Sequence, residues 1–181
     1  RDDANYYWEG KEKDVSVITV DFNISAAENS WTAEPSITGW TYGENANAPV
    51  YGAKFGDVKI EYKKASEPDS AYSASVPANA GDYNVRLSVA ATDNFGALTK
   101  ALDFTIAKAS VAIPTVSGKV YTGENLTADI TDGEHYTVSE NNGGTEVGRY
   151  DVKLKLRDDA NYYWEGKEKD VSVITVDFNI S

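Results

Sequence analysis

The chain has 181 residues, of which 41% are hydrophobic and 12% aromatic, so it is too apolar for a disordered polymer and long enough for one large domain or two small ones. Its net charge of −12 at pH 7 argues against partners that carry negative phosphates, namely nucleic acids and anionic membrane surfaces. The absence of cysteine excludes disulfides, thiolate metal sites and cysteine nucleophiles, and it fits long bacterial surface proteins better than small secreted domains.

The first 25 residues, RDDANYYWEGKEKDVSVITVDFNIS, return letter for letter as residues 157–181. The offset of 156 residues indicates one full period of a tandem array followed by the start of the next period. Such repetition is typical of proteins built for length or multivalency. We interpret residues 1–25 as the closing strands of a preceding repeat copy. We expect residues 15–24 to pair with a strand edge of this chain or of a neighbouring molecule.

A weaker internal repeat divides the rest of the chain. Four short segments recur in the same order. The matching pairs are residues 42–45 and 121–125, 80–87 and 147–154, 92–95 and 159–162, and 103–106 and 177–180. This order predicts two related domains, which we place at 26–107 and 108–181.

Apolar and polar side chains alternate along several segments, which predicts strands with one buried face. The clearest segments are residues 58–63, 83–89, 150–156 and 171–180. Turn residues separate them, and no window has the 3.6-residue period of an amphipathic helix. The pattern predicts an all-β chain of two tandem immunoglobulin-like antiparallel β-sandwiches, with a β-grasp fold as the minor alternative.

In each predicted domain, a glycine stands two residues before a tyrosine that opens a strand. This spacing is typical of a tyrosine corner, in which the phenol bonds back to the nearby backbone. A plain core tyrosine after a turn is the alternative interpretation. The predicted structural residues, with the phenylalanines of the closing strands, are Gly81, Tyr83, Phe104, Gly148, Tyr150 and Phe178.

The two junctions between predicted domains differ in composition. At residues 104–113 one strand runs almost directly into the next, so we expect this junction to restrict bending. The junction to the next copy is represented by residues 25–31. It reads as longer and more polar, and we expect it to bend more.

Three motifs of the first predicted domain lie at residues 42–49, 80–85 and 103–106. With these motifs the chain resembles the immunoglobulin-like repeats of bacterial surface proteins, in particular the MBG-type families named for a Tyr-Gly-x or Tyr-Asp-Gly signature. The second predicted domain matches less well, because Thr122 separates Tyr121 from Gly123. The resemblance implies stalk or adhesive segments of large cell-surface or secreted proteins, and it brings no active-site residues.

Two acidic pairs are weak candidates for calcium ligands: Asp158 with Asp159, and Asp132 with Glu134. Solvated loop charges are the favoured interpretation, because no stretch supplies a full set of oxygen ligands. The single histidine, His135, is expected to be a surface turn residue. No catalytic residue and no cofactor is predicted, since neither a serine triad nor a carboxylate pair in a cleft is indicated.

A dense aromatic group offers candidate glycan contacts, because sugars stack on aromatic faces. The candidates are Trp40, Tyr162, Tyr163 and Trp164. The favoured alternative is that these rings plug the ends of the sandwiches. Lys108 and Asn179 have the residue types of a self-formed isopeptide crosslink, although no motif supports one.

The sequence therefore predicts a non-catalytic stalk or spacer of a bacterial surface adhesin, which projects a functional head from the cell. We expect it outside the cell, attached to the wall or secreted. Its expected partners are adjacent repeats of the same chain and host or matrix glycans. No run approaches the ~18 apolar residues of a membrane span, so no membrane insertion is expected. The alternative function is a carbohydrate-binding accessory module of a large secreted enzyme.

Overall fold

The computed structural model describes residues 6–11, 15 and 17–181, and these residues form an all-β structure. The only helical turn among them is a short 3-10 turn, η1 (Asp69–Ala71). The all-β prediction is therefore confirmed. A β-grasp fold would need a helix packed on its sheet, and the described residues contain none.

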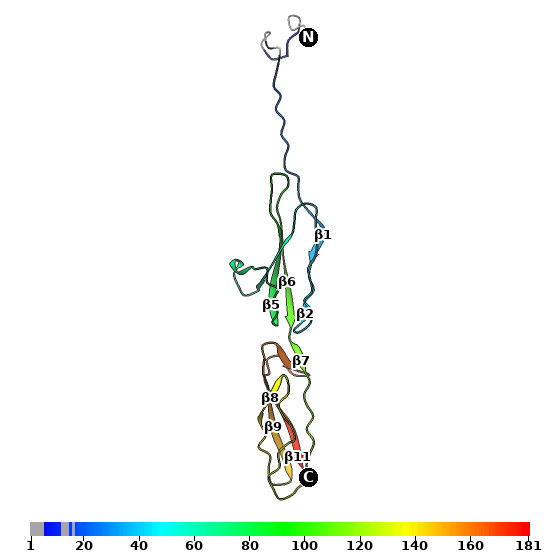
Figure 1. The fold of residues 1–181 in the computed structure, drawn as a ribbon, viewed down its shortest axis with the longest axis vertical. Helices are drawn as coiled ribbons and strands as arrows, with labels where there is room; N and C mark the ends of the chain where they lie inside the picture. The colour runs from blue at the N-terminus through cyan, green and yellow to red at the C-terminus, as the bar shows by residue number, and fades with distance from the viewer. Residues whose placement is uncertain (1–5, 12–14, 16) are drawn as a thin grey trace.

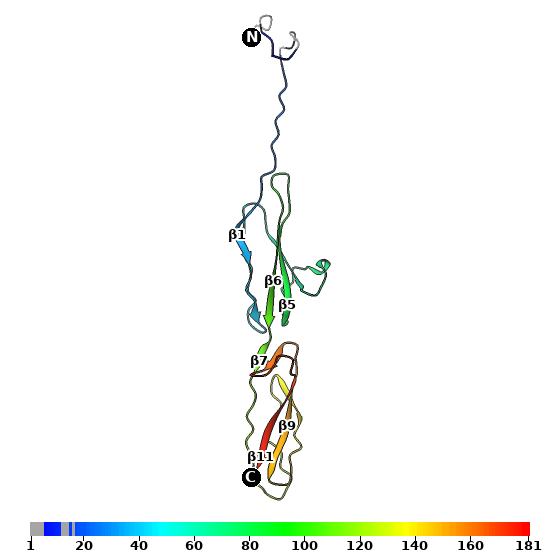
Figure 2. The same ribbon diagram turned by 180° about the vertical axis from the view of Figure 1, so that it is seen from behind.

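The strands fall into two groups that share no sheet, which we call the first and the second unit. The first unit contains β1 (Trp31–Ser36), β2 (Trp40–Thr41), β3 (Val50–Ala53), β4 (Lys59–Lys64), β5 (Gly81–Val89) and β6 (Leu98–Ala107). The second unit contains β7 (Ala109–Val111), β8 (Tyr136–Glu140), β9 (Gly148–Leu156), β10 (Tyr162–Trp164) and β11 (Val173–Ile180). The two units lie end to end along the longest axis of the molecule (Figures 1 and 2).

Each unit combines one larger sheet with a two-stranded sheet. In the first unit the strand order is β2-β6-β5-β4, and β1 pairs with β3. In the second unit the order is β11-β9-β8, and β10 pairs with β7. The long central pairs, β5 with β6 and β9 with β11, are antiparallel.

The central strands form because their side chains alternate between the interior and the solvent. Val85 and Leu87 of β5 are fully buried, as are Val152 and Leu154 of β9. These β-branched and leucine side chains suit a pleated surface that is covered on one face. Each unit consequently has its own hydrophobic core.

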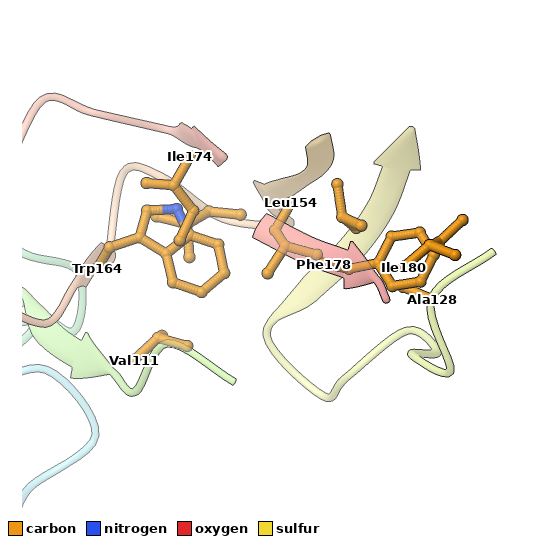
Figure 3. Packing of buried hydrophobic residues seen from close by; sticks show 9 residues of the cluster. Val111, Ala128, Leu154, Trp164, Ile174, Phe178 and Ile180 are labelled. Atoms are coloured by element: carbon orange, nitrogen blue, oxygen red, sulfur yellow. The ribbon is translucent and has the colours of Figure 1, made fainter. Parts of the chain in front are cut away.

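The first core gathers around Phe104 of β6. Trp40 stacks on this ring with a centroid distance of 5.2 Å, and Tyr62 meets it edge-on at 6.1 Å. The second core gathers around Trp164 of β10 and Phe178 of β11, which are both fully buried (Figure 3). The two clusters share no residue.

Tyr83 and Tyr150 occupy matching positions in the two units. The Tyr83 hydroxyl donates a hydrogen bond to the carbonyl oxygen of Asn79, and the Tyr150 hydroxyl donates to that of Glu146, both at 2.9 Å. In each case the acceptor lies four residues upstream, which is the geometry of a tyrosine corner.

The phenylalanines of the closing strands complete this match. Phe104 lies opposite Tyr83 in the β5–β6 register, and Phe178 lies opposite Tyr150 in the β9–β11 register. The ring centroids are 5.7 and 5.9 Å apart, respectively. The internal repeat of the sequence therefore corresponds to a repeated arrangement of aromatic side chains.

Glycine is required at some corner positions and not at others. A Cβ on Gly144 would lie 2.0 Å from the Tyr150 ring, so this glycine makes room for the corner. Gly81 has a positive φ of 149°, whereas Gly148 has no such backbone conformation. At Gly148 a Cβ would meet only ordinary contacts, 3.7 Å from the Tyr150 ring.

The described part of residues 15–24 forms no strand and no bridge. It runs away from the first unit as an extended segment (Figures 1 and 2). The expectation that it pairs with a strand edge of this chain is therefore wrong. The reason is geometric, because the matching strand β9 belongs to the second unit, and the first unit lies between them.

Candidate functional site

The junction between the two units contains hydrogen bonds that join residues of one unit to residues of the other. The chain passes from β6 to β7 through the single residue Lys108. Its ammonium group donates to the backbone carbonyl oxygens of Asp159 and Lys169, at 2.9 Å in the latter case. The backbone N–H of Tyr42 donates to the carbonyl oxygen of Ala107 at 2.8 Å. The side chain of the linking residue is therefore held by the second unit, and the residue before it is held by the first unit.

The buried side chain of Asn161 connects the second unit to the first. Its Oδ1 accepts a hydrogen bond from the backbone N–H of Ala80 at 2.8 Å, and its Nδ2 donates to Oδ1 of Asn79 at 3.4 Å. The carboxylate of Asp158 orients the amide, because its Oδ2 accepts from Nδ2 of Asn161 at 2.7 Å. The tyrosine-corner loop of the first unit is thus held directly by the second.

Aromatic contacts complete the junction. Tyr162 of β10 meets the ring of Tyr42 edge-on at 5.3 Å and stacks on His135 at 4.3 Å. Burial raises the pKa of the Tyr162 phenol, and the nearby Tyr42, Glu134 and Asp158 raise it further. The phenol therefore stays neutral at physiological pH. His135, predicted to be a surface turn residue, forms part of this aromatic contact.

The start of the first unit repeats the backbone pattern of the start of the second unit. The N–H of Ala27 donates to the carbonyl oxygen of Asn94 at 2.8 Å, as the N–H of Ala109 donates to that of Asn161 at 2.9 Å. Ala27 forms a parallel bridge with Phe95, as Ala109 does with Tyr162.

Ile24 lies three positions before Ala27, as Ile106 lies three positions before Ala109. Because the described residues 17–24 form no strand, no preceding unit stands beside residues 25–31 in this structure. The expectation that this junction is longer and bends more therefore stays a prediction. The first unit begins at the bridge between Ala27 and Phe95, four residues before β1. The polar, turn-like composition of residues 25–31 gave no sign of this bridge.

The four acidic calcium candidates do not come together as a site. Asp158 accepts hydrogen bonds from Asn161, and Asp132 accepts from the N–H of Val138 and the guanidinium of Arg157. Of the other two, Glu134 lies 3.9 Å from His135, and the backbone oxygen of Asp159 accepts from the link lysine. The described residues contain no group of three or more acidic or histidine side chains that could hold a metal ion.

The four aromatic glycan candidates are divided between the units and partly buried. Trp40 is packed in the first core, and Trp164 is fully buried in the second, where its Nε1 donates to the carbonyl oxygen of Ser172 at 3.2 Å (Figure 3). Neither indole face is open to a sugar, so assigning these tryptophans as glycan contacts is wrong. Tyr162 belongs to the junction. Tyr163 is partly exposed and lies under the ammonium group of Lys169, 5.6 Å from the ring centroid.

The structure does not bring Lys108 and Asn179 together. Lys108 lies at the junction, whereas Asn179 lies near the end of β11, opposite Arg149 of β9. The ammonium group of Lys108 is already bonded to two carbonyl oxygens. These two residues therefore do not form the crosslink that their types allow.

Sequence reasoning expected the short junction at residues 104–113 to restrict bending, but it did not identify the side chains that make contact across it. The available signal was the internal repeat itself, which aligns Asn161 with Asn94 and Tyr162 with Phe95. Residues that recur at the boundary of two related units are candidates for the contact between those units. Hydrogen-bond partners such as Ala80 have no sequence signature, because a backbone N–H is common to nearly all residues.

No helix in the described part of the chain is long and apolar enough to cross a membrane. No family model matches the chain, and no curated protein matches it.

Proposed function

We propose that the chain is a non-catalytic stalk or spacer segment of a bacterial surface adhesin, in which repeated units hold a functional head at a distance from the cell. The observation that carries this proposal is the junction. A one-residue link, a buried amide and an aromatic contact join two units that lie end to end. A junction of this kind resists bending, so length accumulates with each added unit.

The exact sequence repeat supports the same proposal. Residues 1–25 and 157–181 are identical, and the backbone bond that begins each unit recurs at Ala27 and Ala109. In a longer array each period would therefore add the same increment of length. The net charge of −12 per chain favours separation of neighbouring stalks by mutual repulsion.

The carbohydrate-binding alternative has less support. It depends on exposed aromatic faces, and the two tryptophans among its candidate residues are core side chains. We further propose an extracellular location, on the cell wall or secreted. The lack of cysteine in an otherwise well-packed β protein agrees with that location.

Small-angle scattering on chains with one, two and three copies of the 156-residue period tests the proposal. We expect the maximum dimension to rise by the same increment with each copy. A maximum dimension that levels off or rises irregularly contradicts a stalk.

Asn161→Ala in every copy tests whether the junction carries the stiffness. We expect the variant to keep its strands and to show a smaller average dimension, because the N–H of Ala80 loses its partner. Asn142→Ala, in an exposed loop of the second unit, is the matched control and should leave the dimension unchanged. Equal scattering from both variants would show that Asn161 does not set the geometry.

A further inference from the structure

We propose that the outer end of the second unit, formed by Tyr121, Glu146 and Val147, is a docking surface for the first unit of the following period, which contacts it through Asn94 and Phe95. We call this contact the second junction, and the contact between the two units of this structure the first junction. The inference rests on the proposed function, because it requires the periods to follow one another in one chain. Its support is that this structure contains both halves of the second junction.

The sequence itself places a first unit directly after the closing strands of a second unit. Residues 1–25 repeat residues 157–181, so Ala26 follows the counterpart of Ser181. The counterpart of Ile180, at which β11 ends, lies three positions before Ala27. A link of this length leaves little chain over which the two units could separate.

The outer end of the second unit has the same backbone arrangement as the end of the first unit that forms the first junction. The N–H of Tyr121 donates to the carbonyl oxygen of Ser181 at 2.9 Å, as the N–H of Tyr42 donates to that of Ala107 at 2.8 Å. Ser181 lies at the end of the second unit that points away from the first unit (Figures 1 and 2). One half of a junction is therefore present at this end.

The tyrosine-corner loop at the outer end also matches its counterpart. In the first junction Asn161 accepts a hydrogen bond from the N–H of Ala80, three residues before the corner tyrosine. Val147 stands three residues before the corner tyrosine of the second unit. The side chains of Tyr121 and Val147 are 48% and 64% exposed, so this surface is open to a partner.

The start of the first unit supplies the other half of the second junction. Asn94 and Phe95 take the places that Asn161 and Tyr162 have at the start of the second unit. The ring of Phe95 stacks on Phe55 with a centroid distance of 5.7 Å, which holds it in position. The side chain of Asn94 is exposed.

The contacts of the second junction follow from these equivalences. Oδ1 of Asn94 accepts a hydrogen bond from the N–H of Val147, and the ring of Phe95 meets that of Tyr121. A hydrogen bond to the corner loop and an aromatic contact are the two kinds of contact that also join the units at the first junction.

The second junction has fewer restraints than the first. Ala26 stands in place of Lys108, so no ammonium group binds the carbonyl oxygens of the following unit. Asp158, which orients the amide of Asn161, has the counterpart Ala91. An array therefore alternates a stiff junction with a docked junction that bends more easily.

Pulsed electron paramagnetic resonance on spin-labelled cysteines tests the inference, because the natural sequence has no cysteine. The protein is the full chain extended by a second copy of residues 26–181. Asn179→Cys in the first copy and Thr99→Cys in the second copy place one label on each side of the second junction. The equivalent pair across the first junction is Thr105→Cys with Val173→Cys in one copy. All four side chains are exposed and lie on β6 or β11.

We expect one dominant label distance across the second junction, close to that across the first junction, with a wider distribution. Asn94→Ala in the second copy removes the amide from the contact. It should lower the ratio of docked to undocked molecules about two- to tenfold. The matched control is Asn94→Ala in the first copy, which lies away from the second junction and should leave the distribution unchanged.

A label distribution without a dominant distance would overturn the inference. So would an Asn94→Ala effect that is absent or equal in the two copies, because the contact would then not involve Asn94 of the following unit. Equal widths at the two junctions would contradict the role given to Lys108.

Scattering on one, two and three periods separates this inference from the proposed function. A maximum dimension that rises regularly, without a dominant label distance, refutes the docking and leaves the stalk. A dominant label distance with a maximum dimension that levels off keeps the docking and refutes the stalk.

Discussion

One stretch of sequence occurs twice in this chain and has two structures. In the second copy Trp164, Phe178 and Ile180 are 0%, 1% and 2% exposed, whereas their counterparts Trp8, Phe22 and Ile24 are 49%, 82% and 88% exposed. The second copy forms β10 and β11, and the described residues of the first copy form no strand.

The difference arises because a strand, unlike a helix, cannot satisfy its own backbone. The N–H and C=O groups of β11 need β9 beside them, and its apolar face needs the core of the second unit. Residues 17–24 have neither neighbour within the same chain. Local sequence thus sets the capacity to be a strand, and the partner decides whether the strand exists.

Hydrogen exchange should give the largest contrast between the two copies. We expect the β11 amides that bond to β9 to exchange about a thousandfold more slowly, or more, than amides at matching positions in residues 17–24. Peptide-level mass spectrometry separates the copies, because their flanking sequences differ. Similar protection in both copies would mean that the N-terminal segment is paired in solution, and protection that grows with protein concentration would indicate pairing between molecules.

Replacing Phe178 with alanine, and separately its exposed counterpart Phe22, should give the next largest contrast between the two copies. Phe178→Ala removes a fully buried ring and should destabilise the second unit by about 3–5 kcal/mol. Phe22→Ala removes an exposed ring and should change stability by less than about 0.5 kcal/mol. Urea denaturation measures both variants. Comparable losses from the two substitutions would contradict the assignment of one copy as folded and the other as exposed.

The tryptophans of the two copies should differ severalfold in quenching by acrylamide. Trp164 is fully buried and Trp8 is about half exposed, so a chain retaining only Trp8 should quench more steeply than one retaining only Trp164. The remaining tryptophans, Trp31 and Trp40, are replaced by phenylalanine in both chains. Equal quenching would place both indoles in the same environment and contradict the comparison.

Removal of one charge should give the smallest contrast. Asp177 forms an exposed ion pair with Arg149 and raises the pKa of that guanidinium, but it also lies opposite the carboxylate of Asp151. Asp177→Asn should therefore change stability by less than about 1 kcal/mol, and Asp21→Asn should have no measurable effect. Urea midpoints at low and high salt measure both variants. A loss above about 2 kcal/mol from Asp177→Asn would show that the pair is shielded from solvent.

Much of the fold was predictable because its signals are local. Alternation along residues 83–89 and 150–156 predicted β5 and β9, and the Gly-x-Tyr spacing predicted the backbone bonds of Tyr83 and Tyr150. Each of these features depends on residues within a few positions of one another. The sequence pattern therefore contained the necessary information.

The junction was less accessible to prediction. Asn161 bonds to residues about 80 positions earlier in the chain, and two of its partners are backbone or amide groups with no distinctive pattern. The Tyr-Tyr-Trp stretch at residues 162–164 showed the aromatic residues but not the side on which each ring lies. The ring of Trp164 entered the core, while Tyr162 turned to the neighbouring unit.

By itself the sequence determined an all-β chain with an internal duplication and an exact 25-residue repeat, since alternation and repetition are properties of the chain alone. Only the tertiary structure decided which of two identical segments becomes a pair of strands. It also decided that Trp40 and Trp164 are core residues and that the short link at Lys108 is a fixed junction. Hydrogen bonding between strands and burial between sheets both require a second segment, and no segment carries its partner in its own sequence.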